Sequence, residues 1–196
     1  APAGSKDAER LEVMRREVAR MSTVLDEFRN FSRPLAALSL QRVRLRGIIR
    51  DVVVLEEGRA EARSVNLELR PGDDALLTCD PQKVKQAVLN LVHNALEASP
   101  AGGSVDISLR VDPRSAAQIV VRDSGPGLRP DIADKLFTPG LTTKEHGTGI
   151  GLVVARSIAE QHGGTVTLAS QASGGCEAVL SLPLHVERPA QGAPQS

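Results

Sequence analysis

Two asparagine residues, Asn90 and Asn94, stand four positions apart in a segment with helical periodicity. At this spacing both side-chain amides emerge from one face of a helix. A neutral amide oxygen suits a hard cation such as Mg²⁺, which keeps several of its waters and shares its ligands with phosphates. The spacing is also common among polar surface positions of an amphipathic helix, so the pair alone does not define a site.

The strand expected over residues 118–123 runs into the turn Asp-Ser-Gly-Pro-Gly. A carboxylate buried at Asp123 can accept a hydrogen bond from an exocyclic amine. Adenine carries such an amine at C6, where guanine carries a keto group, so Asp123 favours an adenine nucleotide. Gly125 and Gly127 would let the backbone approach the base closely, although the segment is also simply a good turn.

Three glycines, Gly147, Gly149 and Gly151, precede and begin a helix expected over 148–162. The free N–H groups and the positive end of the helix dipole at such a start suit an anionic phosphate. The pattern G-x-G-x-G differs from the dinucleotide pattern G-x-G-x-x-G and does not follow a strand. No Walker A motif occurs in the sequence.

Residues 124–148 have little periodicity, and a loop of that length inside a compact domain is usually functional. Within it, Thr142, Thr143 and Lys144 offer two hydroxyls and one ammonium that can clamp terminal phosphates. Phe137 is expected to anchor this loop to the core.

In chain order, the segments NLVHNALEA, DSGPG, LFTPGLTTK and GTGIG resemble the N, G1, F and G2 boxes of the sensor histidine kinases. That family binds ATP in a pocket shared with gyrase, Hsp90 and MutL. No single box is specific, whereas four boxes in order are. The T-T-K ending is similar to the nitrogen-regulation branch of the family. The resemblance covers roughly residues 38–184.

The resemblance implies a protein histidine kinase that uses ATP and Mg²⁺, with Asn94 as the magnesium ligand. The ATP-binding residues that it implies are Asn90, Asn94, Asp123, Gly125, Gly127, Thr142, Thr143, Lys144, Gly147, Thr148, Gly149 and Gly151. In the ATP-hydrolysing relatives a Glu stands where this chain has Asn90, and it activates water as a general base. An amide cannot accept that proton, so we expect ATP to be held without rapid hydrolysis.

The family transfers the γ-phosphoryl group to a histidine on the first helix of its dimerisation domain, for relay to a response regulator. The four histidines of this chain, His93, His146, His162 and His185, lack the sequence context of that acceptor. We therefore expect the acceptor helix upstream of Ala1, and no autophosphorylation by this chain alone. The alternatives are an anti-sigma-type Ser kinase and a nucleotide-sensing binding module with the same fold.

A long helix is expected over residues 5–33, ended by Pro34. Its apolar positions form an a/d seam over three heptads: Leu11, Met14, Val18, Met21, Leu25 and Phe28. The helix resembles the second helix of the family's dimerisation hairpin. We expect it to pair in a helical bundle, as a homodimer in the full-length protein; the alternative is packing on its own globular domain.

The expected domains are 1–34 as half of a dimerisation hairpin, 35–185 as an ATP-binding catalytic domain, and 186–196 as a disordered tail rich in Pro, Gln and Gly. Strands are expected over 38–45, 65–69, 76–79, 105–111, 118–123, 165–170 and 177–182, and helices over 46–63, 81–99 and 148–162. Helices on one face of a mostly antiparallel sheet make an α+β two-layer sandwich. The resemblance implies the same fold, the Bergerat fold with a mixed sheet. In the helix over 46–63, the apolar face is expected at Ile48, Ile49, Val52, Val53 and Leu55.

The chain carries 24 acidic and 24 basic residues, so it lacks the excess positive charge typical of nucleic-acid binding. No apolar run approaches the roughly 18 residues of a membrane-spanning helix, which favours a cytoplasmic location for this part of the protein. Cys79 and Cys176 form no C-x-x-C motif and are expected to be buried thiols in a reducing compartment.

Overall fold

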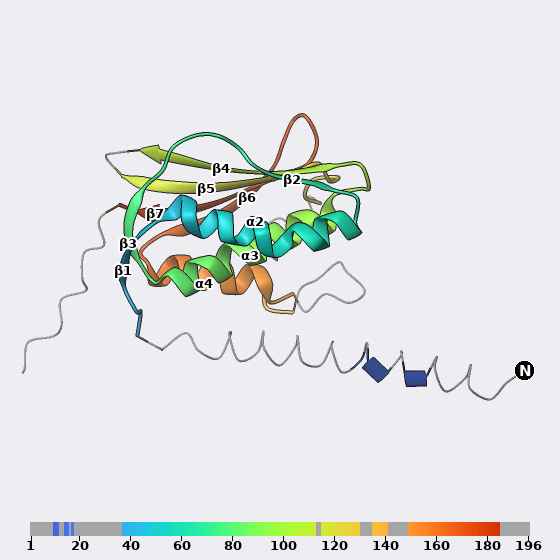
Figure 1. Ribbon diagram of the computed structural model, residues 1–196, viewed down its shortest axis with the longest axis horizontal. Coiled ribbons are helices and arrows are strands. Elements are labelled where there is room, and N and C mark those ends of the chain that lie inside the picture. Colours follow the sequence, from blue (N-terminus) through green and yellow to red (C-terminus); the bar gives the residue numbers. More distant parts are fainter. Residues whose placement is uncertain are drawn as a thin grey trace, which may run out of the picture.

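The computed structural model describes residues 10, 11, 14, 15, 17, 37–112, 115–129, 135–140 and 149–184. Three helices cover one face of a sheet and form a second layer (Figure 1). The helices are α2 (Leu45–Ala62), α3 (Pro81–Ala98) and α4 (Gly151–Gln161). The strands are β1 (Gln41–Arg44), β2 (Asn66–Leu69), β3 (Leu76–Cys79), β4 (Ser104–Asp112), β5 (Ala116–Asp123), β6 (Thr165–Ser170) and β7 (Cys176–Pro183). The predicted α+β two-layer sandwich is confirmed.

Five strands form the main sheet in the order β2-β4-β5-β7-β6. The pairing of β2 with β4 is parallel and the other three pairings are antiparallel, so the sheet is mixed, as the resemblance implies. Strands β1 and β3 pair separately as a two-stranded antiparallel ribbon.

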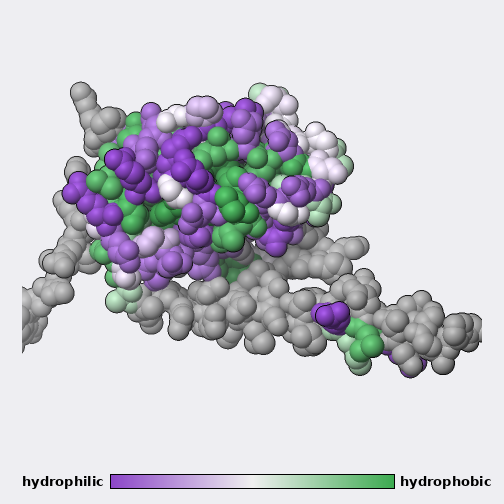
Figure 2. Space-filling model, viewed as in Figure 1, coloured by the Kyte–Doolittle hydropathy of each residue, from purple (hydrophilic) through white to green (hydrophobic). Residues whose placement is uncertain are grey.

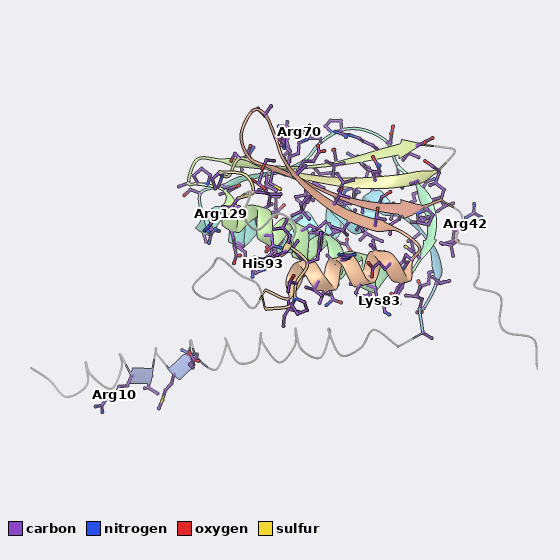
Figure 3. The ribbon with its side chains drawn as sticks, turned by 180° about the vertical axis from the view of Figure 1, so that it is seen from behind. Arg10, Arg42, Arg70, Lys83, His93 and Arg129 are labelled. Atoms are coloured by element: carbon purple, nitrogen blue, oxygen red, sulfur yellow. The ribbon has the colours of Figure 1, made fainter. Side chains whose placement is uncertain are left out.

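Alternation along the strands divides the sheet into an apolar face under the helices and a polar open face. Val105, Ile107, Ile119 and Leu180 are fully buried beneath the helices. The opposite face carries ion pairs that follow the strand register, such as Arg122 Nε with Glu177 Oε2 at 2.6 Å. Another joins the guanidinium of Arg70, seen on the sheet layer in Figure 3, to Asp106 at 2.9 Å.

Helix α3 is the central helix of the helical layer and carries a continuous apolar stripe (Figure 1). Its buried residues recur at helical spacing: Val84, Ala87, Val88, Leu91, Val92, Ala95 and Leu96. The Asp80 carboxylate caps its start by accepting hydrogen bonds from the backbone N–H groups of Gln82 and Lys83 at 3.1 and 3.2 Å. Pro81 at the first helical position completes the predicted start signal.

Helix α2 buries a different set of residues from the one predicted. Leu55 is 58% exposed, so its assignment to the apolar face is wrong. At about 100° per residue, Leu55 lies about 120° around the helix from Ile49, whereas Glu56 lies about 20° from Ile49 and is buried. The Arg59 guanidinium donates to both oxygens of Glu56 at 2.7 and 2.6 Å, which satisfies the buried carboxylate. Figure 2 shows apolar residues among polar ones on the face where α2 lies.

A buried histidine joins α4 to the start of α3. His162, which is 2% exposed, follows the last residue of α4. Its Nδ1 donates to the Ile158 carbonyl at 2.7 Å, and its Nε2 accepts from the backbone N–H of Asp80 at 3.0 Å. This pair of bonds requires the neutral ring with its proton on Nδ1. The Asp80 carboxylate also accepts from the backbone N–H of Ser39 at 3.0 Å, so the chain entering the domain is tied to the same point.

The N-terminal segment is described only at residues 10, 11, 14, 15 and 17, all of which are helical. Leu11 and Met14 of the predicted seam are 62% and 64% exposed. Val18, Met21, Leu25 and Phe28 lie outside the described residues. Among the helices that the structure describes, none is long and apolar enough to cross a membrane.

His162→Phe should lower the free energy of unfolding by about 1–3 kcal/mol, because the buried Asp80 N–H loses its acceptor. Urea unfolding measures the effect. The same change at the part-exposed His93 is the matched control and should cost less than about 0.5 kcal/mol. Equal stability of the two variants would contradict the proposed role of His162.

Candidate functional site

The start of α4 lies directly on the two asparagines of α3. Asn90 Nδ2 donates a hydrogen bond to the Gly151 carbonyl oxygen at 3.0 Å across 61 residues of chain. A Cβ built on Gly151 would lie 3.8 Å from Asn90 Cγ and 3.9 Å from Asn94 Nδ2. Both asparagines therefore share one helix face, as their spacing predicts. Gly151, the last residue of the fourth predicted box, is their neighbour in space.

The N-terminus of α4 presents backbone N–H groups beside this pair. Ile150 occupies the N-cap position, and its aliphatic side chain cannot accept from the first turn. The first turn of α4 contains no acidic residue. Gly149 has φ +66°, a left-handed conformation that glycine adopts without strain. The end of the helix therefore keeps the partial positive charge that suits a phosphate.

Asp123 ends β5 with its carboxylate fixed by two backbone donors. Its Oδ1 accepts from the N–H of Gly125 at 2.8 Å and from the N–H of Cys176 at 3.1 Å. Burial raises the pKa of Asp123 above its ordinary value, and the two hydrogen bonds act in the opposite direction. The sequence predicted the residue and the Gly125 turn but missed Cys176, because the turn before β7 carries no motif of its own.

Gly125 is required by packing as well as by any approach to a ligand. A Cβ there would lie 2.7 Å from the Ala98 carbonyl oxygen and 2.9 Å from Asp123 Oδ1. Gly127 has φ +82°, which a residue with a side chain rarely adopts. The Asp123 turn is thereby held against the C-terminal end of α3, the helix that carries both asparagines.

Phe137 anchors the described part of the long loop, as expected. It packs against the hydrophobic core, and the Arg156 guanidinium of α4 lies 5.1 Å from its ring centroid. Thr142, Thr143, Lys144, Gly147 and Thr148 lie outside the described residues.

The other titratable groups near α3 are paired or buried. His93 Nε2 lies 2.9 Å from Glu97 Oε1, one turn along the same helix. Burial raises the pKa of both the Cys79 and the Cys176 thiol to about 11, so both are neutral at ordinary pH. No cluster of three or more His, Cys, Asp or Glu side chains that could hold a metal occurs among the described residues.

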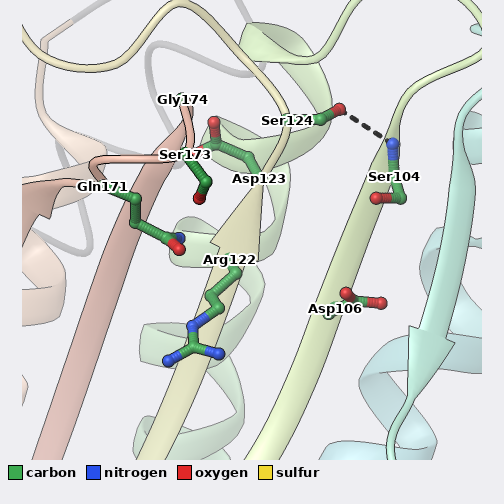
Figure 4. Close-up of a pocket in the computed structure, with 8 residues that line it drawn as sticks. All are labelled: Ser104, Asp106, Arg122, Asp123, Ser124, Gln171, Ser173 and Gly174. Carbon is green, nitrogen blue, oxygen red and sulfur yellow. Dashed lines mark hydrogen bonds between the residues drawn. The ribbon is translucent and has the colours of Figure 1, made fainter.

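A polar pocket of about 380 Å³ lies at the start of β4 and the end of β5 (Figure 4). Asp123 is the one predicted site residue in its wall. The other lining residues are Ser104, Asp106, Arg122, Ser124, Gln171, Ser173 and Gly174.

The two-layer fold brings the helix with the two asparagines, the Asp123 turn and a helix that begins at a glycine close together. The family model described as "Histidine kinase-, DNA gyrase B-, and HSP90-like ATPase" matches residues 79–186. The chain therefore belongs to this family.

The comparisons with individual proteins agree with the family. The chain is 35% identical over 189 residues to the sensor histidine kinase ZraS of Escherichia coli K12, covering 96% of this chain and 40% of that protein. It thus spans about 40% of the length of this relative. Full-length ShkA in complex with AMPPNP matches 93% of this chain and 40% of its own, with TM-score 0.79 and 23% identity, which shows the shared fold. The structure of the histidine kinase ThkA in complex with the response regulator TrrA matches 94% of this chain and 53% of its own, with TM-score 0.74 and 25% identity.

Asp123→Ala should be less stable than Asp123→Asn by about 1–3 kcal/mol, because alanine leaves the Gly125 and Cys176 N–H groups without an acceptor. Urea unfolding of the two variants measures the difference, and equal stabilities would contradict the bonding described here.

Because the pKa of Asp123 is raised in the folded protein, the free energy of unfolding should depend on pH. The protonated Asp123 carboxyl group contributes fully to wild-type stability below its ordinary pKa of 3.8. This contribution is lost as the pH rises through the higher pKa that the group has in the folded protein. The stability of wild type relative to Asp123→Asn should therefore fall as pH rises from about 4.

Proposed function

We propose that this chain is the ATP-binding catalytic domain of a sensor histidine kinase. It would transfer the γ-phosphoryl group of ATP to a histidine on a dimerisation helix outside this chain, for relay to an aspartate of a response regulator. Support comes from ZraS, which is named a sensor histidine kinase, and from the ThkA structure, in which a kinase is bound to a response regulator.

The observation that carries the proposal is Asn90 and its contact with Gly151. An ATPase of this class needs a general base to activate water, and an amide has no basic site for that proton. The Asn90 amide is instead engaged in joining α3 to α4 at 3.0 Å. Such a site suits the holding of ATP for an external acceptor better than its hydrolysis.

In the proposed site, each group of residues binds a different part of the nucleotide. Asp123 accepts from the adenine amine, with Gly125 and Gly127 in the turn beside the base. The start of α4 at Gly149 and Gly151 faces the phosphates. Thr142, Thr143, Lys144, Gly147 and Thr148 bind the phosphates from the loop before it.

The donor set near Asn94 fits Mg²⁺ bound chiefly by phosphates and water. Asn94 supplies one neutral amide oxygen there, and the described residues hold no metal-ligating cluster that would cage the ion on protein ligands alone. When bound, Mg²⁺ would offset the charge of the phosphate oxygens. Asn94 would orient them, and Asn90 would hold the helix start against them.

In the reaction, the acceptor imidazole nitrogen forms a bond to the γ-phosphorus while the bond from that phosphorus to the β–γ bridging oxygen breaks. ADP leaves with the bonding electrons. Catalysis in this class is mostly positioning and electrostatic stabilisation, so the chain's own contribution is the placement of the γ-phosphate. The domain then needs a partner that carries the acceptor.

The N-terminal seam is proposed as half of a dimerisation hairpin that pairs in a homodimer. Support comes from Leu11 and Met14, whose exposure of 62% and 64% leaves apolar surface open to another helix. No observation favours the anti-sigma-type kinase or the nucleotide sensor over this assignment.

Calorimetric titration in the presence of Mg²⁺ tests the proposal. Wild type should bind ATP in the micromolar range and should not bind GTP, whose base lacks the C6 amine. Asn94→Ala should lose ATP binding, because it removes the proposed metal ligand. Asn66→Ala, on the exposed start of β2, is the control and should bind as wild type does. Failure of the wild type to bind ATP would contradict the proposal.

A further inference from the structure

The hairpin between β6 and β7 lies against Asp123. It turns through Gly174 and Gly175, which have φ +90° and +84°. The turn is closed by hydrogen bonds from Gly174 N to the Gln171 carbonyl and from Gln171 N to the Gly175 carbonyl, both at 3.0 Å. Figure 4 shows Ser173 and Gly174 of this turn beside the Asp123 side chain.

The two glycines have the same backbone conformation but different surroundings. A Cβ on Gly175 would collide with the Asp123 carbonyl oxygen and would lie 2.9 Å from the Asp123 carbonyl carbon. A Cβ on Gly174 would meet nothing within 4 Å. Of these two glycines, only Gly175 must lack a side chain for the hairpin to lie in close contact with β5.

This contact brings the Cys176 N–H onto the Asp123 carboxylate. Oδ1 accepts both from Cys176 at 3.1 Å and from Gly125 at 2.8 Å. Both donors take the same oxygen, so the carboxylate is held in one orientation. Oδ2 has no hydrogen bond to any of the described residues, and it is the oxygen left to a ligand.

We propose that Gly175 and the backbone N–H of Cys176 position Asp123 for base selection. Because Oδ1 already accepts two backbone hydrogen bonds, a ligand would bind to Oδ2, which can accept a hydrogen bond but not donate one. A base with an amine at C6 is favoured, and one with a keto group there is opposed by two facing acceptors. This inference rests on the proposed function, and it adds the hairpin to the residues that determine nucleotide specificity.

The surroundings of the hairpin explain why a side chain at position 175 would act on the carboxylate. The polar pocket of about 380 Å³ borders Ser173 and Gly174, which gives the turn space to shift. A Cβ at position 175 would push the turn away from β5 and would carry the Cys176 N–H with it. Oδ1 would then lose one donor and the carboxylate its fixed orientation.

Binding of ATP and of ITP, whose base has a keto group at C6, distinguishes this role from a structural one. Gly174→Ala and Gly175→Ala impose similar backbone strain, so they form a matched pair. Wild type and Gly174→Ala should prefer ATP over ITP by the same ratio. Gly175→Ala should reduce that ratio at least about tenfold, chiefly through weaker ATP binding.

An unchanged ATP-to-ITP ratio in folded Gly175→Ala, or an equal loss of affinity for both nucleotides, would overturn the inference. If the wild type binds neither nucleotide, the proposed function itself fails. If Gly175→Ala does not fold, the inference is tested on the wild type by following the NMR signals of the Gly125 and Cys176 backbone amides as pH is varied. They should titrate together with the Asp123 carboxylate, and independent titration would overturn the inference.

Discussion

The antiparallel contact between α3 and α4 is the constraint on which the rest of the site depends. It is fixed at one end by Asn90 and the Gly151 carbonyl, and at the other by His162 and the Asp80 N–H. Lys83, seen beside α4 in Figure 3, adds a hydrogen bond to Gln161 at 2.6 Å. Because both ends are tied by polar groups of specific geometry, α4 cannot slide along α3. Its N-terminus is thus held over the two asparagines.

The surroundings of Asp123 balance burial against hydrogen bonding. Burial of Asp123 disfavours its charge, and the two N–H groups on Oδ1 recover part of that cost. Gly125 and Gly175 permit this arrangement, since a Cβ at either position would meet Asp123 or its neighbours. The carboxylate is therefore oriented by backbone groups, with the side chains around it left small.

Local signals in the sequence were enough to predict most of the helices and strands. The Asp80–Pro81 start and the stripe of α3 predicted its bounds and the common face of Asn90 and Asn94, because both follow from helix geometry alone. Three features join segments far apart in the chain: the parallel pairing of β2 with β4, the hydrogen bond from the Asp80 N–H to His162, and that from the Cys176 N–H to Asp123. No local pattern encodes them. Leu55 was misassigned because the prediction relied on its apolar side chain and not on its position around the helix. Glu56 is buried instead, and Arg59 donates hydrogen bonds to its carboxylate.

The nucleotide site proposed for this chain consists of α3, the turn after β5 and the start of α4. Amide chemical-shift mapping with Mg²⁺ and AMPPNP tests it most directly. The account predicts saturable shifts of the Asn90 and Asn94 side-chain amides together with the backbone amides of Gly125 and Gly151, and no shift of Gln118 on the open face of the sheet. Shifts confined to the open face, with the asparagine amides unmoved, would contradict it.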